Sequence, residues 1–192
     1  MSTQKIQSII ESSIAVKQQY VADPAFLQKI NEAVTLVASA FKDGFKVQFC
    51  GNGGSAADAQ HLAAEFSGRF YKNRKALPSD ALHCNSSYLT AVANDYSYDD
   101  IYSRLVEGTM YKGDVLVGIS TSGNSGNIVK AFEMAKSMGI VTIGFTGAAG
   151  GKMSELSDVL INVPSTDTPR IQESHILIGH IICELVEAQL FA

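Results

Sequence analysis

The sequence predicts a single α/β domain over residues 1–192, a doubly wound five-stranded parallel sheet with two helices before it. Short apolar runs alternate with stretches of helical apolar spacing, which is the pattern of strands joined by helices. Two of these runs, ending at Cys50 and Ser120, lead into loops rich in Gly and Ser and then into a helix. A chain of 192 residues is long enough for one full core and short for two. Ligands of such sheets bind at the carboxyl ends of the strands.

Two helices are expected before the first strand. Apolar residues recur near helical spacing from residue 3 to about residue 20, and Asp23-Pro24 then ends that helix. Pro24 suits the first turn of a second helix, whose broad apolar stripe ends at Gly44. This helical pair, about residues 3–43, has more apolar surface than one small sheet buries. Subunit contacts and a plain core role are both compatible with it.

The stretch FKVQFCGNGGSAADAQHLAAEFSG, residues 45–68, organises the remaining chain. It predicts a strand ending at Cys50, a tight loop with three glycines around Asn52, and a helix from Ser55. Glycine lets the loop backbone approach a ligand closely, and Ser55 can cap the helix while offering a hydroxyl. We therefore expect an anion to bind here.

The other expected elements follow from apolar runs and breaks. His83 and Cys84 are interpreted as strand residues. In chain order we expect a short strand at 81–84, helices at 86–93 and 98–110, a strand at 114–120, a helix at 128–138, strands at 140–145 and 158–163, and a helix at 171–190.

A second loop, after the strand at 114–120, carries four hydroxyls in six residues, namely Ser120, Thr121, Ser122 and Ser125. Hydroxyls and the free N–H groups of a helix start form a neutral cradle for a phosphate monoester. The lysine of a nucleotide-triphosphate loop does not follow, so a triphosphate is disfavoured. The alternative is a capped loop without a ligand.

His61 and Glu65 stand at i and i+4 on the helix that follows the glycine loop. This spacing fits two metal ligands or an acid/base pair, and equally a surface ion pair. On the last helix, His180 lies in the apolar run ILIGHIIC, where a histidine is either a core residue or a site residue. Gln172 lies eight residues earlier, about 12 Å along a straight helix. If Gln172 and His180 serve one site, His180 is expected to come from a second subunit.

Three further polar residues could reach the same sheet edge. Arg69 follows the first site helix, and Asn94-Asp95 ends another helix. A surface ion pair and a helix stop are their simpler roles.

Net charge and cysteine usage limit which partners and which cellular compartment the sequence favours. The formal net charge is −4 with no prominent Lys/Arg cluster, which argues against a nucleic-acid partner. Three scattered cysteines without a CxxC pair favour a reducing cytoplasm. No stretch approaches the roughly 18 apolar residues of a membrane span, and we expect no membrane association.

Four motifs together resemble one family along essentially the whole chain: CGNGGSAADAQH, ISTSGNS, TGAAGGKM and RIQESHILIGH. They are similar to the sugar isomerase (SIS) domain, specifically to the phosphoheptose isomerases. The resemblance implies a flavodoxin-like three-layer fold and a homotetramer with active sites shared between subunits. It implies conversion of sedoheptulose 7-phosphate to D-glycero-D-manno-heptose 7-phosphate, the first step toward heptose precursors of lipopolysaccharide or capsule.

The resemblance also implies residue roles. Glu65 and His180 would be the catalytic pair. One zinc ion per subunit would be held by His61, Glu65, Gln172 and His180. The substrate contacts would be Asn52, Gly53, Gly54, Ser55, Glu65, Arg69, Asn94, Asp95, Ser120, Thr121, Ser122, Ser125 and Gln172.

Two alternatives stay open beside this interpretation. Some SIS proteins bind the replication initiator DnaA and share much of the glycine loop, which makes a non-catalytic binding module the first alternative. The presence of both Glu65 and His180 favours the enzyme. Isomerisation of another sugar phosphate, such as a pentose 5-phosphate, is the second.

Overall fold

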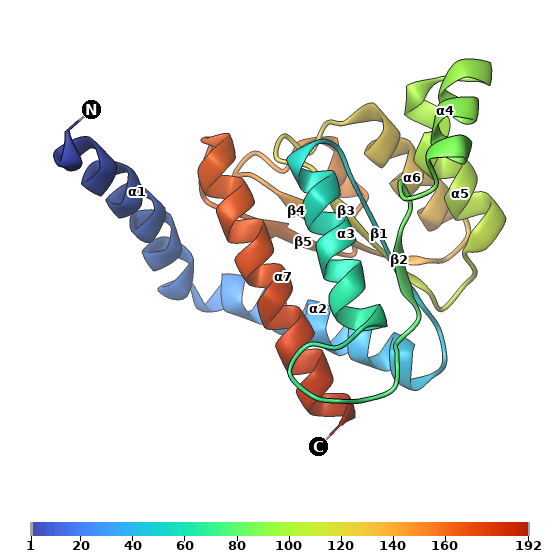
Figure 1. The fold of residues 1–192 in the computed structure, drawn as a ribbon, viewed down its shortest axis with the longest axis horizontal. Helices are drawn as coiled ribbons and strands as arrows, with labels where there is room; N and C mark the ends of the chain where they lie inside the picture. The colour runs from blue at the N-terminus through green and yellow to red at the C-terminus, as the bar shows by residue number, and fades with distance from the viewer. Residues whose placement is uncertain (1, 192) are drawn as a thin grey trace.

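The computed structural model describes residues 2–191 and contains one five-stranded sheet (Figure 1). Every neighbouring pair is parallel, in the order β2-β1-β3-β4-β5, so the predicted fold class is confirmed. This strand order is that of flavodoxin-like folds. The strands are β1 Val47–Gly51, β2 Ser79–Ala81, β3 Val115–Ile119, β4 Val141–Thr146 and β5 Val159–Asn162.

Helices cover both faces of the sheet and give the molecule three layers. Helices α2, α3 and α7 bury their apolar sides in one core, and α4, α5 and α6 in the other (Figure 1). Side chains of β1 alternate between these cores: Phe49 packs in the first and Cys50 in the second. The helices are α1 Thr3–Val21, α2 Pro24–Lys42, α3 Gly54–Ser67, α4 Ser86–Asp95, α5 Ile101–Thr109, α6 Gly126–Ser137 and α7 Thr168–Leu190, with 3-10 turns η1 Tyr98–Asp100 and η2 Gly151–Glu155.

The predicted strand at 81–84 is wrong, and with it the strand assignment of His83 and Cys84. Strand β2 ends at Ala81, and the Cys84 N–H donates back to the Ala81 carbonyl at 3.2 Å, which closes a turn. The Asn85 side chain then accepts from the Tyr88 N–H and caps α4, so the chain must leave the sheet before residue 85.

Three helix boundaries also differ from expectation. Asn94 and Asp95 form the last turn of α4 instead of lying beyond it, and the helix expected at 98–110 begins as the 3-10 turn η1. Helix α7 begins at Thr168, because Pro169 pre-sets the backbone of its first turn.

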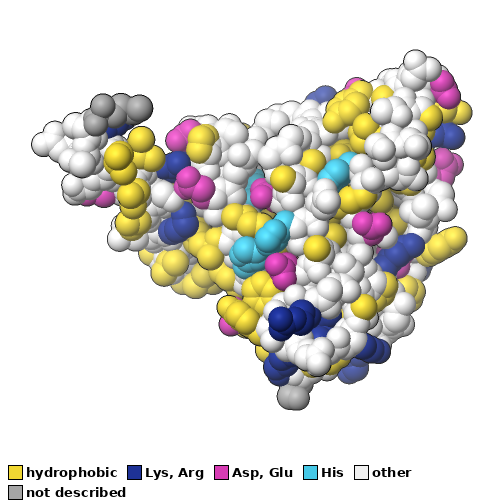
Figure 2. All heavy atoms as spheres, in the orientation of Figure 1, with side chains coloured by type: hydrophobic (Ala, Val, Ile, Leu, Met, Phe, Trp, Pro, Cys, Tyr) yellow, Lys and Arg dark blue, Asp and Glu magenta, His cyan; other side chains and the backbone are white. Residues whose placement is uncertain are grey.

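Helix α1 extends away from the remaining molecule (Figure 1). Four of its isoleucines, Ile6, Ile9, Ile10 and Ile14, are between 45% and 56% exposed. Figure 2 shows apolar side chains in a row along this helix. No helix of residues 2–191 combines the length and the hydropathy that crossing a bilayer needs.

Helices α3 and α7 lie side by side (Figure 1) and position much of the candidate site. A Cβ atom at Gly179 would come within 2.5 Å of Leu62 Cδ1. Leu62 is only 1% exposed and borders a small apolar cavity together with Gly179, so its side chain must shift within the core to admit a Cβ. Glycine at position 179 therefore permits the close approach of the two helices.

We expect Gly179→Ala to destabilise the fold by about 1–3 kcal/mol through overpacking, despite the better helix propensity of alanine. Urea unfolding followed by circular dichroism measures this. Gly108→Ala is the matched control, since Gly108 is exposed on α5 and its Cβ would meet nothing within 4 Å. It should stabilise the protein by roughly 0.4–1 kcal/mol. Equal stability of Gly179→Ala and the native chain would contradict the packing argument.

The buried histidine of α7 is His175, not His180. The His175 ring is fully buried, and its Nε2–H donates to the Thr146 carbonyl at 3.1 Å. Burial lowers the pKa of His175 from 6.5 to about 4, although the hydrogen bond opposes this. His180 is only half-buried. The core role considered for His180 therefore belongs to His175.

The depressed pKa of His175 predicts a loss of stability in acid. The unfolded state binds a proton as pH falls below 6.5, while the folded state resists protonation down to about pH 4. The contribution of neutral His175 to the free energy of unfolding is therefore complete above pH 6.5. It falls by about 3 kcal/mol as the pH decreases from 6.5 to about 4. His175→Gln lacks this titration, so its unfolding free energy should fall less steeply over that window. Parallel curves for the two proteins would refute the assignment.

Candidate active site

The hydroxyl loop between β3 and α6 gathers three serines. Ser120 Oγ lies 2.9 Å from Ser125 Oγ and 3.5 Å from Ser122 Oγ. Ser125 precedes the first residue of α6, and its side chain makes no capping bond. Its hydroxyl and the first N–H groups of the helix are therefore suited to an anion at the positive end of the helix dipole.

The loop after β4 supports the hydroxyl loop. The Gly147 N–H donates to the Thr121 carbonyl at 2.9 Å, and the Met153 N–H donates to the Gly123 carbonyl at 3.1 Å. Gly123 has φ +65°, and a Cβ there would overlap the Gly150 carbonyl. The two loops therefore interlock through their backbones, which holds the hydroxyls in place.

The glycine loop is tied to the hydroxyl loop by an amide pair. Asn52 and Asn127 exchange two hydrogen bonds of 2.9 Å, and the Tyr98 hydroxyl donates to Asn52 Oδ1 at 3.0 Å. Asn127 is only 1% exposed. Sequence reasoning missed Tyr98 and Asn127. The one local signal that could have indicated Asn127 is a polar residue at a buried position in the first turn of α6.

The start of α3 meets the start of α7. Gly53 has φ +56°, and Ser55, 4% exposed, follows in the first turn of the helix. A Cβ at Gly54 would lie 2.9 Å from Gln172 Nε2. Gln172 thus lies beside the glycine loop, where the sequence placed the substrate contacts.

Two turns along α3, three titratable side chains converge. His61 Nε2 lies 3.0 Å from His180 Nε2 and 3.1 Å from Glu65 Oε1. One ligand atom from each of the three lies within 4.8 Å of the others. His61 and Glu65 come from α3 and His180 from α7, so the helix packing creates this His61–Glu65–His180 cluster.

The cluster fits a metal ion. Two imidazole lone pairs 3.0 Å apart repel unless a proton or a cation lies between them. Two nitrogen ligands of tetrahedral zinc, each about 2.05 Å from the ion, lie about 3.3 Å apart. Two histidines and one carboxylate are also the protein ligands of many catalytic zinc sites, where a fourth position stays open.

The four predicted zinc ligands do not come together within one chain. His180 approaches His61 and Glu65 of its own chain, so the expectation that His180 comes from a second subunit does not hold for this cluster. Gln172 lies at the other end, beside Gly54, and the rise of α7 separates it from His180 by about 12 Å.

The other predicted contacts lie in two places. Arg69 follows the far end of α3, a helix of 14 residues, so it does not share the edge of the glycine loop as expected. Asn94 and Asp95 are exposed and joined by a 2.9 Å hydrogen bond. They lie three or four residues before Tyr98, whose hydroxyl reaches Asn52.

Comparisons with known proteins agree with this geometry. The SIS domain profile matches residues 11–147. The chain is 54% identical over 186 residues to a phosphoheptose isomerase of Aneurinibacillus thermoaerophilus, covering 97% of this chain and 94% of the relative. A phosphoheptose isomerase of Clostridium acetobutylicum is 53% identical, with 97% and 95% covered.

Solved structures give the same result. The phosphoheptose isomerase of Neisseria gonorrhoeae superposes with a TM-score of 0.90 at 39% identity, covering 96% of this chain and 98% of that one. That of Francisella tularensis gives 0.92 at 34% identity, with 98% and 100% covered. These relatives favour the enzyme over the DnaA-binding alternative. The chain belongs to the SIS domain family and, within it, to the phosphoheptose isomerases.

Proposed function

We propose that this isomerase converts sedoheptulose 7-phosphate to D-glycero-D-manno-heptose 7-phosphate, with Glu65 and His180 as its catalytic pair. The observation that carries the residue assignment is the approach of Glu65, His61 and His180 on two adjacent helices. The product enters heptose precursor synthesis for lipopolysaccharide or capsule. All three cysteines are free thiols, which supports the predicted cytoplasmic location.

The substrate is held at its phosphate by neutral groups. Ser120, Ser122 and Ser125 offer hydroxyls at the start of α6, and the Thr121 hydroxyl belongs to the same loop. The substrate hydroxyls contact the glycine loop and Gln172. The remaining substrate contacts proposed are Asn52, Gly53, Gly54, Ser55, Arg69, Asn94 and Asp95.

The reaction moves one proton between adjacent carbons through an enediol. A base takes a proton from C1 of the ketose and a proton returns to C2, while O1 loses its hydroxyl proton and O2 gains one, so both transfers run from position 1 to position 2. Glu65 and His180 share these transfers, since a carboxylate and an imidazole can each accept and donate a proton. When bound at His61, Glu65 and His180, zinc supplies Lewis-acid polarisation of the substrate carbonyl.

We further propose that the enzyme is a homotetramer with shared active sites. The exposed isoleucines of α1 form an apolar face of the kind that subunit interfaces cover. In a shared site, Gln172 and Arg69 would each approach site residues of a neighbouring subunit. That arrangement would complete the four-ligand zinc site that one chain leaves divided.

Glu65→Gln and His180→Gln should each fold and lose at least about 100-fold in kcat, because each removes one proton-transfer group. The measurement is formation of an aldoheptose 7-phosphate from sedoheptulose 7-phosphate. Glu184→Gln is the control, an exposed carboxylate on α7 one turn past His180, and it should retain full activity. Full activity of either site variant would refute its catalytic role.

The same assay with a chelator tests the metal. We expect turnover to be lost on chelation and restored by zinc. An unchanged rate in the presence of the chelator would support the isomerase activity and contradict a role for zinc in the mechanism. No turnover under any condition would contradict the proposed substrate.

Replacing Ile6, Ile10 and Ile14 together by serine should convert the tetramer to smaller species, because the apolar face of α1 is lost. Sedimentation velocity at micromolar concentration measures the change. Lys5→Ser with Gln7→Ser alters exposed polar positions of the same helix and should leave the tetramer intact. A native chain that sediments as a monomer would rule out the assembly.

A further inference from the structure

A buried ion pair lies outside the proposed catalytic and metal-binding groups. Arg74 Nε donates to Glu187 Oε1 at 2.9 Å, and both side chains are only 2% exposed. Removing two charges from water is costly unless their other hydrogen-bonding groups are also satisfied. The hydrogen-bond partners of the two buried charges therefore indicate what the pair does.

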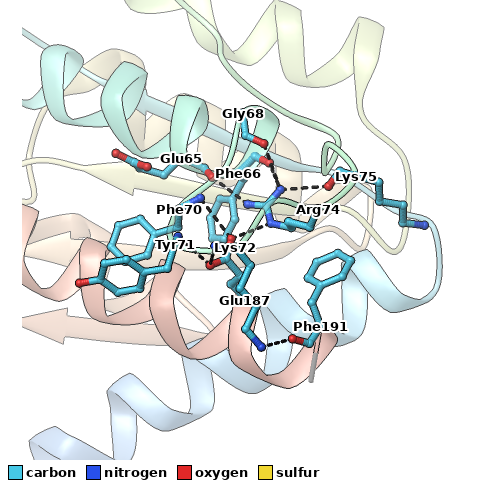
Figure 3. Close-up of polar contacts among 10 residues, drawn as sticks. All are labelled: Glu65, Phe66, Gly68, Phe70, Tyr71, Lys72, Arg74, Lys75, Glu187 and Phe191. Carbon is cyan, nitrogen blue, oxygen red and sulfur yellow. Dashed lines mark hydrogen bonds and ion pairs between the residues drawn. The ribbon is translucent and has the colours of Figure 1, made fainter.

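Both partners are satisfied by one loop, residues 68–75 (Figure 3). The Glu187 carboxylate accepts from the N–H groups of Phe70, Tyr71 and Lys72 at 3.1, 2.8 and 2.8 Å. Burial alone would raise the pKa of the Glu187 carboxyl, but these donors and Arg74 outweigh it and hold the pKa below its usual range. The carboxylate is thus charged at neutral pH.

Arg74 uses its other donors on the end of α3. Its Nη2 donates to the Glu65 carbonyl at 2.8 Å, and Nη1 donates to the carbonyls of Phe66 and Gly68 at 2.8 and 3.3 Å. These are carbonyls that a helix leaves without partners at its C-terminus. Arg74, Glu187 and the loop 68–75 are named the Arg74–Glu187 clasp below.

The clasp is joined to the cluster through the main chain of Glu65 and the ring of Phe70. Arg74 holds the main chain of Glu65, whose carboxylate points away from the clasp (Figure 3). Glu187 lies seven residues after His180, two turns along the same face of α7. Between them, the Phe70 ring lies 5.8 Å from the His180 ring, and the Phe70 N–H donates to Glu187.

This arrangement depends on the shape of the guanidinium group as well as on its charge. Only the planar fork of arginine can serve Glu187, Glu65 and Phe66 at once, and lysine cannot. Replacing the pair by apolar side chains would also leave three loop N–H groups without their acceptor, so stability and positioning must be separated by experiment.

We propose that the Arg74–Glu187 clasp is a positioning device that fixes Glu65 and His180 relative to one another. It rests on the proposed function, because its effect on turnover is transmitted through those two residues. The hydroxyl loop lies at the other end of α3, so the clasp should act on kcat and on metal binding more than on the contacts to the substrate phosphate. Arg69 is the one proposed substrate contact that the loop 68–75 itself carries.

The test compares Arg74→Lys and Glu187→Gln with the native enzyme. For each protein, kcat and KM are measured with sedoheptulose 7-phosphate, and Co²⁺ is titrated into metal-free protein while its visible spectrum is recorded. All values are normalised to the folded fraction from circular dichroism. Lys72→Ala is the control, since it keeps the N–H that Glu187 uses and removes an exposed ammonium that donates to the Phe191 carbonyl.

We expect both variants to lose at least about 10-fold in kcat, with a smaller factor of change in KM through Arg69. Co²⁺ affinity should fall about 10- to 100-fold, as when outer-shell partners of metal ligands are removed. Lys72→Ala should behave as the native enzyme. Unchanged kcat and Co²⁺ binding, or losses accounted for by the unfolded fraction alone, would overturn the proposal.

A double variant, Arg74→Met with Glu187→Leu, separates positioning from stability. It removes both charges without leaving either unpaired, but it also leaves the N–H groups of Phe70, Tyr71 and Lys72 without their acceptor, so its folded fraction is measured first. At equal folded fraction, a kcat that stays low supports positioning, whereas a native kcat shows a purely structural pair. If the native enzyme and Lys72→Ala show no turnover while Co²⁺ spectra still respond to Arg74→Lys, the proposed reaction fails and the positioning role stands.

Discussion

The packing of α3 against α7 is the constraint on which the site depends. Gly179 lets the helices approach, and from that contact every pairing follows in register: Gly54 beside Gln172, Leu62 beside Gly179, and His61 beside His180. Farther along the same pair of helices, Glu187 of α7 and Arg74 hold the end of α3. One helix pair therefore carries substrate contacts at one end and titratable groups farther along.

The hydroxyl loop and the His61–Glu65–His180 cluster differ in charge: the first is neutral and the second is titratable. The hydroxyl loop offers dipoles and N–H groups to the proposed phosphate and carries no lysine. The cluster instead concentrates two imidazoles and a carboxylate that can hold a cation or move protons. In the proposed reaction, this separation would keep the phosphate dianion away from the Glu65 carboxylate.

Local sequence pattern predicted the sheet, most helices and both loops, because strand and helix periodicity and glycine punctuation act over a few residues. The i,i+4 pair of His61 and Glu65 was visible in the same way. What could not be predicted are pairings between distant segments. The Asn52–Asn127 amide pair spans 75 residues and the Arg74–Glu187 ion pair 113.

The two histidines of α7 show the same limit. Both lie among apolar residues, and only the tertiary packing decides that His175 faces the Thr146 carbonyl while His180 faces His61. The short strand β2 was misplaced because its end is set by the Asn85 cap that follows it. A helix cap competes with strand pairing for the same backbone, and the apolar pattern alone does not show where the strand ends.

The N-terminal helix is joined physically to the site. The Arg170 guanidinium donates to the Ile9 carbonyl of α1 and to Glu173, and Glu173 also accepts from the Ser13 hydroxyl. Arg170 lies two residues before Gln172 at the start of α7. A subunit that covered the isoleucines of α1 would therefore also bear on the turn that holds Gln172. In the proposed tetramer, that turn would couple assembly to the proposed substrate end of the site.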